Sequence, residues 1–322
     1  MSTPLRTALA AVGVATMLAA VSAAWATPPG PNGKLVFRRF LDERRLTGAL
    51  FTANADGTGI KRITHAGKTG LDNEPDWSPD GTRIVFERST GPRDERIYIV
   101  NADGSGAHSV ARCTGGCAGQ EAPAWSPDGT EIAFASGGVR YEQVWVVGVD
   151  GSNLRRLTRA DGLDADPQWS PDGRKIVFRR IDPFRPRKGY ALFVINVDGS
   201  GERRLTPWAL RAGDHPDWSP DGKRILFRSN VEGPKTISSN LYTIRPDGTG
   251  LKQITRARGG DVQHLSAGFS PDGNWIVFSR TPGHGRDANA DVFVMRADGT
   301  GTRNVTRSEI WDSAVDWGAA RH

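Results

Sequence analysis

The chain has 322 residues, of which 37% are hydrophobic and 24% charged, and its ten Trp and twelve Phe can supply a large core. This composition excludes a disordered chain. Basic residues exceed acidic residues by only six, and no long basic run concentrates the excess. A dedicated nucleic-acid-binding protein is therefore not expected.

The N-terminal segment has the pattern of a secretory signal peptide. Arg6 precedes an uncharged stretch rich in Ala, Val and Leu, which ends at Ala24-Trp25-Ala26. A basic start, an apolar stretch and small residues at a cleavage site are typical of such peptides. We expect residues 1–26 to be removed and the mature chain to be periplasmic or secreted, with no stable membrane insertion. An uncleaved anchor is the alternative.

One motif, Pro-Asp-Trp-Ser-Pro-Asp-Gly, organises most of the chain. It occupies residues 75–81, recurs unchanged at 216–222 and with one change at 123–129 and 167–173, and has Phe269 for tryptophan in a fifth copy at 267–273. Each copy is followed by two short β-branched and aromatic runs, an Asp-Gly turn and a basic stretch. Proline, aspartate and glycine favour the dihedral angles of tight turns. Each unit therefore predicts four short strands separated by turns.

The spacing of the motif predicts a β-propeller. Its aromatic residues lie 44 to 51 residues apart, which matches one four-stranded propeller blade. Repeats are expected at about residues 72–112, 120–159, 164–207, 213–256 and 262–307. Residues 31–66 resemble a blade without its first strand, and residues 312–318 resemble that missing strand. We expect residues 27–322 to form an all-β, six-bladed propeller of antiparallel blades, closed by pairing of the C-terminal strand with the N-terminal blade.

At these motifs the sequence resembles the periplasmic Tol-Pal-type propeller family, which is built from WD40-like PD40 repeats. The resemblance covers about residues 31–318. The periplasmic Tol protein has an N-terminal α/β domain before its propeller, and propeller peptidases of the prolyl oligopeptidase type have a C-terminal hydrolase domain. The sequence matches neither addition. The resemblance therefore implies a stand-alone TolB-like propeller.

Acidic and histidine side chains precede the repeat aromatic residues by three to five positions. In a propeller these segments enter the innermost strands, so they are expected to ring one mouth of the central channel. A ring of this kind suits a cation, a basic side chain or sugar hydroxyls, whereas the alternative is that the carboxylates cap neighbouring backbone amides. The candidates are Asp72, Glu74, Glu121, Asp164, Asp166, Asp214, His215, His264 and Asp312.

Two histidines and two cysteines suggest metal and disulfide chemistry. His215 and His264 are the candidates for a transition-metal site, with an inter-blade hydrogen bond as the alternative. The mouth also suits a divalent cation, although nothing in the sequence requires a cofactor. Cys113 and Cys117 are separated by three residues in an exported chain, so we expect a local disulfide.

Two functions are compatible with these features. No nucleophile elbow, zinc-protease motif, phosphate loop or dinucleotide fingerprint occurs. The favoured hypothesis is therefore a monomeric, non-enzymatic module that binds an envelope protein or a peptide, with no nucleic-acid partner. The alternative is a metal-assisted carbohydrate-active enzyme, similar to polysaccharide lyases of this repeat type, with its site at the channel mouth.

Overall fold

The computed structural model describes residues 30–91, 94–110, 119–138, 141–159, 162–184, 189–233, 236–257, 262–281 and 289–321. Within these ranges the chain forms 24 strands and one short 3-10 turn, η2 (Trp208–Leu210). The predicted all-β class is therefore confirmed. The expected signal peptide at residues 1–26 and the expected disulfide between Cys113 and Cys117 lie outside the described residues.

The strands recur in four kinds, following the sequence repeat. The strands that carry the repeat aromatic residue, here called the inner strands, are β4 (Leu71–Trp77), β8 (Gln120–Trp125), β12 (Leu163–Trp169), β16 (Ala212–Trp218), β20 (Gln263–Phe269) and β24 (Asp312–Ala319). The second strands are β1 (Asn32–Phe40), β5 (Arg83–Ser89), β9 (Glu131–Gly138), β13 (Lys175–Ile181), β17 (Ile225–Gly233) and β21 (Trp275–Thr281).

Two further kinds complete the pattern. The third strands are β2 (Gly48–Ala53), β6 (Arg96–Asn101), β10 (Tyr141–Gly148), β14 (Tyr190–Asn196), β18 (Thr236–Ile244) and β22 (Asp291–Arg296). The short fourth strands are β3 (Lys61–Arg62), β7 (His108–Ser109), β11 (Arg155–Arg156), β15 (Arg203–Arg204), β19 (Lys252–Gln253) and β23 (Arg303–Asn304).

One strand of each kind joins a group of four, here called a run, in which the inner strand pairs with the second, the second with the third and the third with the fourth. All of these pairings are antiparallel. In the run that contains the N-terminus, β24 pairs with β1, with Leu35 opposite Trp317. Single parallel contacts, such as Gly48 opposite Leu71, then join successive runs in pairs. The outcome is three mixed sheets of eight strands. The sequence predicted the antiparallel pairing but not these parallel contacts.

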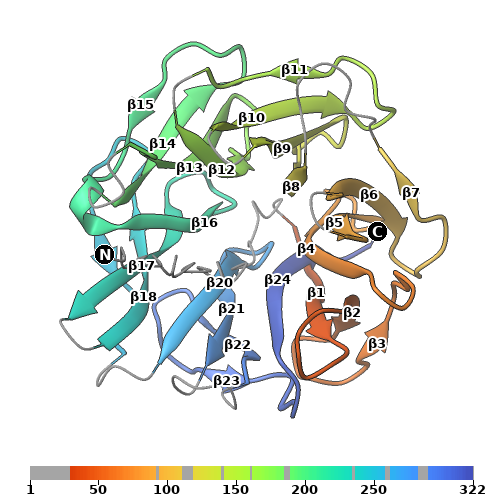
Figure 1. Ribbon diagram of the computed structural model, residues 1–322. Helices are drawn as coiled ribbons and strands as arrows, with labels where there is room; N and C mark the ends of the chain where they lie inside the picture. The colour runs from red at the N-terminus through yellow and green to blue at the C-terminus, as the bar shows by residue number, and fades with distance from the viewer. Residues whose placement is uncertain are drawn as a thin grey trace, which may run out of the picture.

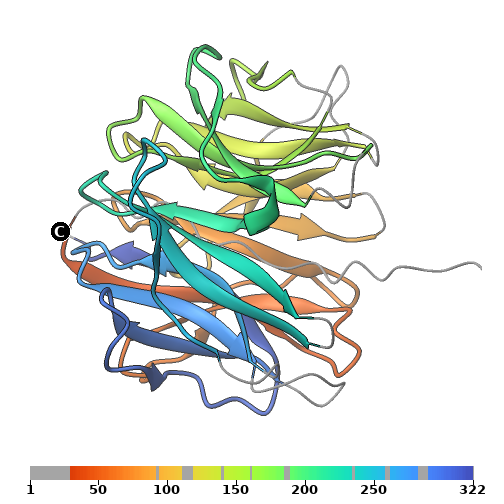
Figure 2. The same cartoon turned by 90° about the vertical axis from the view of Figure 1, so that its left-hand side faces the viewer.

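The inner strands lie nearest the centre of the molecule, and the other strands follow outward (Figure 1). Each inner strand contacts the next one along the chain, from β4 to β24, and β24 also contacts β4. The view from the side shows the strands as stacked, twisted layers (Figure 2). The end of this arrangement at which the inner strands begin, beside Asp72, Asp164 and Asp312, is here called the entry face.

The hydrophobic core lies between successive runs of strands. Each of the six clusters found among the described residues combines side chains from two neighbouring runs. One of them packs Val292 and Val294 of β22 against Leu35 of β1 and Trp317 of β24. Burial of large apolar side chains is the main stabilising contribution to a fold of this kind. The two ends of the described chain therefore share one core cluster.

The repeated Ser-Pro-Asp-Gly segments form tight turns at the opposite end from the entry face. In the first turn, Ser78 Oγ donates to Asp80 Oδ1 at 2.6 Å, and the amide of Gly81 donates to the carbonyl of Ser78 at 2.8 Å. Gly81 has a φ of 65°, which glycine adopts without a steric penalty. The aspartate of the Ser-Pro-Asp-Gly segment thus accepts a hydrogen bond within its own turn.

Candidate functional site

The inner strands share an irregularity three residues before the repeat aromatic residue. Their pairing with the second strands shifts register at this point in β4, β8, β12, β16 and β20. Glu74, Asp166 and His215 lie there with φ values of 49°, 53° and 55°. A β-bulge of this kind re-aims the side chains around it. Asp72 and Glu74, only two positions apart, consequently have different surroundings.

The three aspartates that begin the inner strands on the entry face are ion-paired. Each is fully buried and faces an arginine on the second strand of its own run. The paired aspartates and their arginines are Asp72 with Arg88 at 2.6 Å, Asp164 with Arg180 at 2.5 Å, and Asp312 with Arg39 at 2.7 Å. Each arginine also lies over aromatic rings of its own sheet. These three carboxylates therefore hold strands together.

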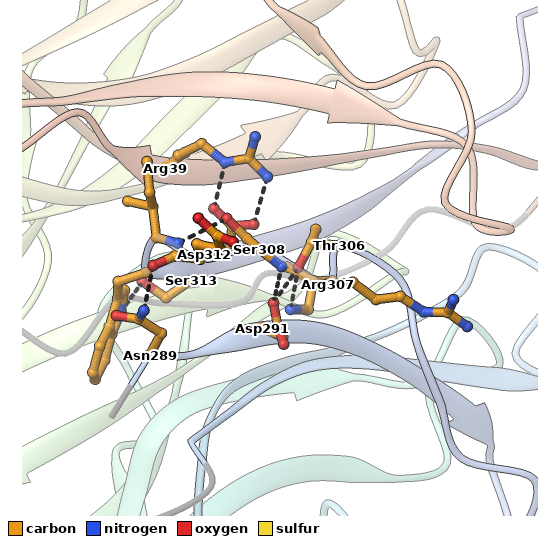
Figure 3. A network of polar contacts seen from close by, with 12 residues as sticks. Arg39, Asn289, Asp291, Thr306, Arg307, Ser308, Asp312 and Ser313 are labelled. Atoms are coloured by element: carbon orange, nitrogen blue, oxygen red, sulfur yellow. Dashed lines mark hydrogen bonds and ion pairs between the residues drawn. The ribbon is translucent and has the colours of Figure 1, made fainter. Parts of the chain in front are cut away.

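The surroundings of Asp312 show how completely such a carboxylate is used (Figure 3). Arg39 donates to both of its oxygens, at 2.7 and 2.8 Å. Burial raises the pKa of Asp312, while the hydrogen bond and charge of Arg39 oppose that rise. Nearby, Asp291 accepts from the amide of Ser308 at 2.7 Å and from Thr306 Oγ1 at 3.1 Å. At the junction between β22 and β24, both aspartates thus have hydrogen-bond partners.

Two other predicted candidates lie on β16 and β20. His264 Nδ1 donates to the carbonyl of Ser239 at 2.8 Å, and Ser239 Oγ donates back to the carbonyl of His264 at 2.6 Å. Burial lowers the pKa of His264 to about 4, with Arg280 and Arg228 adding to that effect. Asp214 lies opposite Arg228 in the strand register. His264 thus joins β18 to β20.

A buried carboxyl pair lies next to the bulge of β4. Glu74 and Glu87 each expose 7% of their surface and hydrogen-bond to each other. Burial, together with repulsion from Asp166 and Glu121, raises the pKa of Glu74 to about 8. Burial and the charge of Glu74 raise the pKa of Glu87 well above its ordinary value. Two hydrogen-bonded carboxyls must share a proton.

Further acidic residues from β8, β10 and β12 surround this pair. Burial raises the pKa of Glu142 to about 8, with added repulsion from Glu121. Glu121 opens to solvent, yet the surrounding protein still raises its pKa, and Glu95 and Asp166 add repulsion. Glu74, Glu87, Glu121 and Glu142, here called the unpaired glutamates, make no ion pair with any described residue. One part of the entry face therefore carries carboxyl groups that have no ion-pair partner among the described residues.

Asp166 differs from the unpaired glutamates because it contacts an arginine and a histidine. Arg179 Nε lies 2.8 Å from its Oδ2, and His215 Nδ1 lies 3.8 Å from its Oδ1. His215 is 2% exposed and Asp166 is 6% exposed. The predicted residues Glu74, Glu121, Asp166 and His215 thus do belong to one region of the entry face.

A set of aspartates that sequence reasoning missed joins neighbouring runs. The aspartate directly before the aromatic residue accepts the amide of the next run's aromatic residue: Asp76 from Trp125 at 2.7 Å, Asp217 from Phe269 at 2.6 Å, and Asp316 from Trp77 at 2.9 Å. Burial raises the pKa of Asp316 to about 7. Their place inside the repeated motif was the available signal.

Sequence reasoning also missed Glu87, Glu142 and Arg179, which come from second and third strands. Glu87 follows Ile84-Val85-Phe86, at the position where Arg179 follows another Ile-Val-Phe run. In the part of the chain that the structure describes, no three His, Cys, Asp or Glu side chains converge as metal ligands. In the same ranges no helix is long and apolar enough to cross a membrane.

Comparisons with known proteins agree with this architecture. A family model described as the TolB beta propeller domain, PD40, matches residues 108–206. The structure of TolB from Acinetobacter baumannii is 18% identical, with a TM-score of 0.71 over 89% of this chain and 67% of that chain. The chain has a TolB-like PD40 propeller fold. The expected resemblance to this family is therefore confirmed.

Other solved structures share the TolB-like propeller fold. A putative TolB from Agrobacterium tumefaciens is 20% identical, with a TM-score of 0.60 over 90% of this chain and 99% of that chain. An oligogalacturonate lyase in complex with manganese is 17% identical, with a TM-score of 0.53 over 86% of this chain and 74% of that chain. No curated protein matches the chain in sequence. At these identities the likeness concerns the fold.

Proposed function

We propose that the protein is an exported, non-enzymatic TolB-like propeller that binds another envelope protein or a peptide at its entry face. The observation that carries this proposal is the group of unpaired glutamates, because buried carboxyls without an ion-pair partner ionise only at a cost that a cationic partner would offset. Structural carboxylates elsewhere on the same face are ion-paired. The unpaired glutamates are therefore available for a partner.

We also infer that the strands form six four-stranded blades in a closed ring. The pairing of β24 with β1, the contact between β20 and β24, and the shared core cluster around Trp317 support closure. A closed ring leaves only the short fourth strands as outer sheet edges, which limits edge-to-edge aggregation. It also gives a partner a rigid surface to bind.

The entry face also offers apolar surface. A cleft of about 570 Å³ lies between the turn after β1 and the segment before β24, and its lining includes Leu41, Arg45, Ile310 and Trp311. Arg45 lies 4.0 Å over the ring of Trp311, and Ile310 is 42% exposed. Aromatic and arginine side chains beside exposed apolar residues are typical of protein interfaces. This cleft suits the apolar part of a peptide.

Export is part of the same proposal and rests on the sequence of residues 1–26. The comparison with periplasmic TolB proteins supports the same compartment. We propose that the mature chain acts in the periplasm or outside the cell as a monomer. N-terminal sequencing of the exported protein tests the cleavage after Ala26.

The experiment that tests binding compares three proteins in a pull-down from envelope extract. They are the wild type, a Glu74→Gln/Glu142→Gln variant and a Lys223→Gln control, whose side chain is 81% exposed in a turn at the opposite end. We expect a specific partner with the wild type and the control, and its loss with the double variant. No specific partner, or equal recovery with all three proteins, would contradict the proposal.

A metal-assisted lyase is the second candidate, and the fold shared with a manganese-bound oligogalacturonate lyase favours it. In this candidate function, His215 and His264 would provide the metal-binding side chains, and Asp166 lies beside His215. The test is elemental analysis of the purified protein, followed by incubation with oligogalacturonate and Mn²⁺. Ultraviolet absorbance of unsaturated products would support a lyase. Absence of both bound metal and product would remove this candidate.

A further inference from the structure

The starting observation is the hydrogen bond between Glu74 of β4 and Glu87 of β5. Because carboxylates only accept hydrogen bonds, one of the two carboxyl groups carries a proton. Both side chains are more than nine-tenths buried. Their contact raises the pKa of Glu87 further, which makes Glu87 the donor and Glu74 the acceptor. At neutral pH the pair therefore holds at least the one proton that this hydrogen bond requires.

The second observation is an oxygen of Glu74 that lacks a partner. Glu74 Oε2 is buried and has no hydrogen bond within the described structure. A buried carboxylate oxygen without a donor is unfavourable, and such groups are uncommon in proteins. The other oxygen of Glu74 is committed to Glu87 only while Glu87 keeps its proton. A positively charged donor would satisfy both carboxyls at once.

The cations next to the pair are committed to other groups. Arg38 Nη1 donates to Asn73 at 2.6 Å, and its Nη2 donates to Ser313 at 2.5 Å, so Arg38 joins β4 to β24. Arg179 contacts Asp166. The groups that face the pair are the carboxyls of Glu95, Glu121, Glu142 and Asp166 and the guanidinium groups of Arg38 and Arg179.

The chemistry of the missing cation follows from the spread of these carboxyls. Among the described residues no three acidic or histidine side chains converge on a point where a metal ion would be held. An ammonium has three donors and a guanidinium has five in a planar fork, and each sits on a long, flexible chain. A side-chain cation can therefore bridge carboxyls that are too dispersed for one metal ion.

We propose that the unpaired glutamates capture a lysine or arginine side chain of the partner, and that capture expels the proton shared by Glu74 and Glu87. This inference rests on the peptide-binding function proposed above. In the step, the cation donates to Glu74 Oε2 and to Glu87, the hydrogen bond between the two carboxyls breaks, and the released proton passes to the buffer. The carboxyl pair thereby becomes doubly negative, and the charge of the partner's cation offsets part of that charge.

The pH dependence follows from the same step. Glu74 and Glu142 each have a pKa of about 8, so at neutral pH the unoccupied protein holds protons that a cation would displace. Binding is therefore expected to tighten as pH rises from 6 towards 8. Linkage predicts about a tenfold change in affinity per pH unit for each proton released.

Isothermal titration calorimetry with acetylated pentalysine amide tests this step. The titration is run at pH 7 in phosphate and in Tris, whose different ionisation heats reveal the number of protons released. We expect pentalysine to bind with release of at least one proton, and acetylated pentaglutamate amide not to bind. Glu87→Gln keeps an N–H donor for Glu74, so it should fold, lose the proton release and bind pentalysine about tenfold more weakly.

The matched control is Glu131→Gln, which removes the same charge from a partly exposed residue at the opposite end of the molecule. Equal weakening in both variants, or pentalysine binding without proton release, would overturn the inference. Failure of pentalysine to bind while the pull-down still recovers a partner would also overturn it and leave the proposed function standing. Failure of both experiments would remove the proposed function as well.

Discussion

Two sets of acidic residues share the entry face and differ in their partners. The paired aspartates Asp72, Asp164 and Asp312 each contact an arginine on the neighbouring strand of the same run. The unpaired glutamates have no such arginine, and burial raises the pKa of two of them, Glu74 and Glu142, to about 8. Carboxyl groups at similar positions in the repeat can therefore either hold strands together through an ion pair or stay unpaired and able to bind a partner.

The β-bulge explains the difference. Asp72 precedes the register shift of β4 and lies directly opposite Arg88, whereas Glu74 lies within the shift and faces Glu87 and the neighbouring runs. Strand alternation would put both side chains on one face. Glu74 has a left-handed backbone conformation, which changes the direction of the side chains around it. One strand therefore supplies both an ion-paired aspartate and a glutamate that can bind a partner.

The largest expected effect comes from deleting residues 315–322. This deletion removes most of β24, the strand that carries the ion-paired Asp312. Trp317 is 3% exposed and packs in the cluster shared by β22, β1 and β24. Loss of a buried tryptophan alone costs about 3–5 kcal/mol, and the deletion also leaves β1 without its neighbour. Thermal unfolding should show loss of the cooperative transition. A control lacking only residues 321–322 should melt like the wild type; an unchanged transition in the longer deletion would argue against closure.

A smaller but clear loss is expected when one paired aspartate is neutralised. Asp312→Asn leaves the guanidinium of Arg39 beside a neutral amide, and breaking a buried ion pair costs about 3 kcal/mol. A double-mutant cycle with Arg39→Gln, measured by urea denaturation, should show strong coupling between the two positions. Additive effects of the two substitutions would mean that the pair does not stabilise the fold.

The carboxyl pair should produce a pH dependence of stability. The pKa of Glu74 is about 8 in the folded protein and 4.5 in the ordinary state, so the folded protein holds the extra proton between these values. Its stabilising effect is present at pH 4.5 and is lost as pH rises through 8. The melting temperature of Glu74→Gln should therefore fall less than that of the wild type between pH 5 and pH 8. Equal slopes would show that Glu74 ionises normally.

The smallest expected effect concerns His264. Its pKa of about 4 lies below the ordinary 6.5, so the folded protein holds it neutral. The linked stability is present above pH 6.5 and is lost as pH falls through 4, which is opposite in direction to the effect of Glu74. A titration followed by the NMR signal of the imidazole should show no protonation between pH 7 and pH 5. A midpoint near 6.5 would contradict the buried contact with Ser239.

The repeat made most of the fold predictable, whereas the site was only partly so. The motif around Trp77 and its 44 to 51 residue spacing determine the strand order, since turn residues and strand residues alternate regularly. The register shift is not visible in that pattern. The sequence alone therefore groups Asp72 with Glu74, although only one of them is ion-paired.

Part of the missing information was nevertheless present in the repeats. Arginine follows the second-strand phenylalanine by two residues where the inner strand begins with aspartate, as in Arg88 with Asp72. Where that aspartate is replaced by Gln120, the facing residue is Ser136. By contrast, Glu87 and Glu142 come from different strands of different runs. Only their placement in three dimensions brings them to Glu74.

The distinction between paired and unpaired acids is tested most directly by the unfolding free energy of two triple variants at pH 8. One is Asp72→Asn/Asp164→Asn/Asp312→Asn, and the other is Glu74→Gln/Glu87→Gln/Glu142→Gln. The account predicts a strongly destabilised aspartate variant, because each of three arginines loses a buried carboxylate partner. It predicts a glutamate variant at least as stable as the wild type, because repulsion is removed. A glutamate variant that is destabilised as much as the aspartate variant would contradict the account.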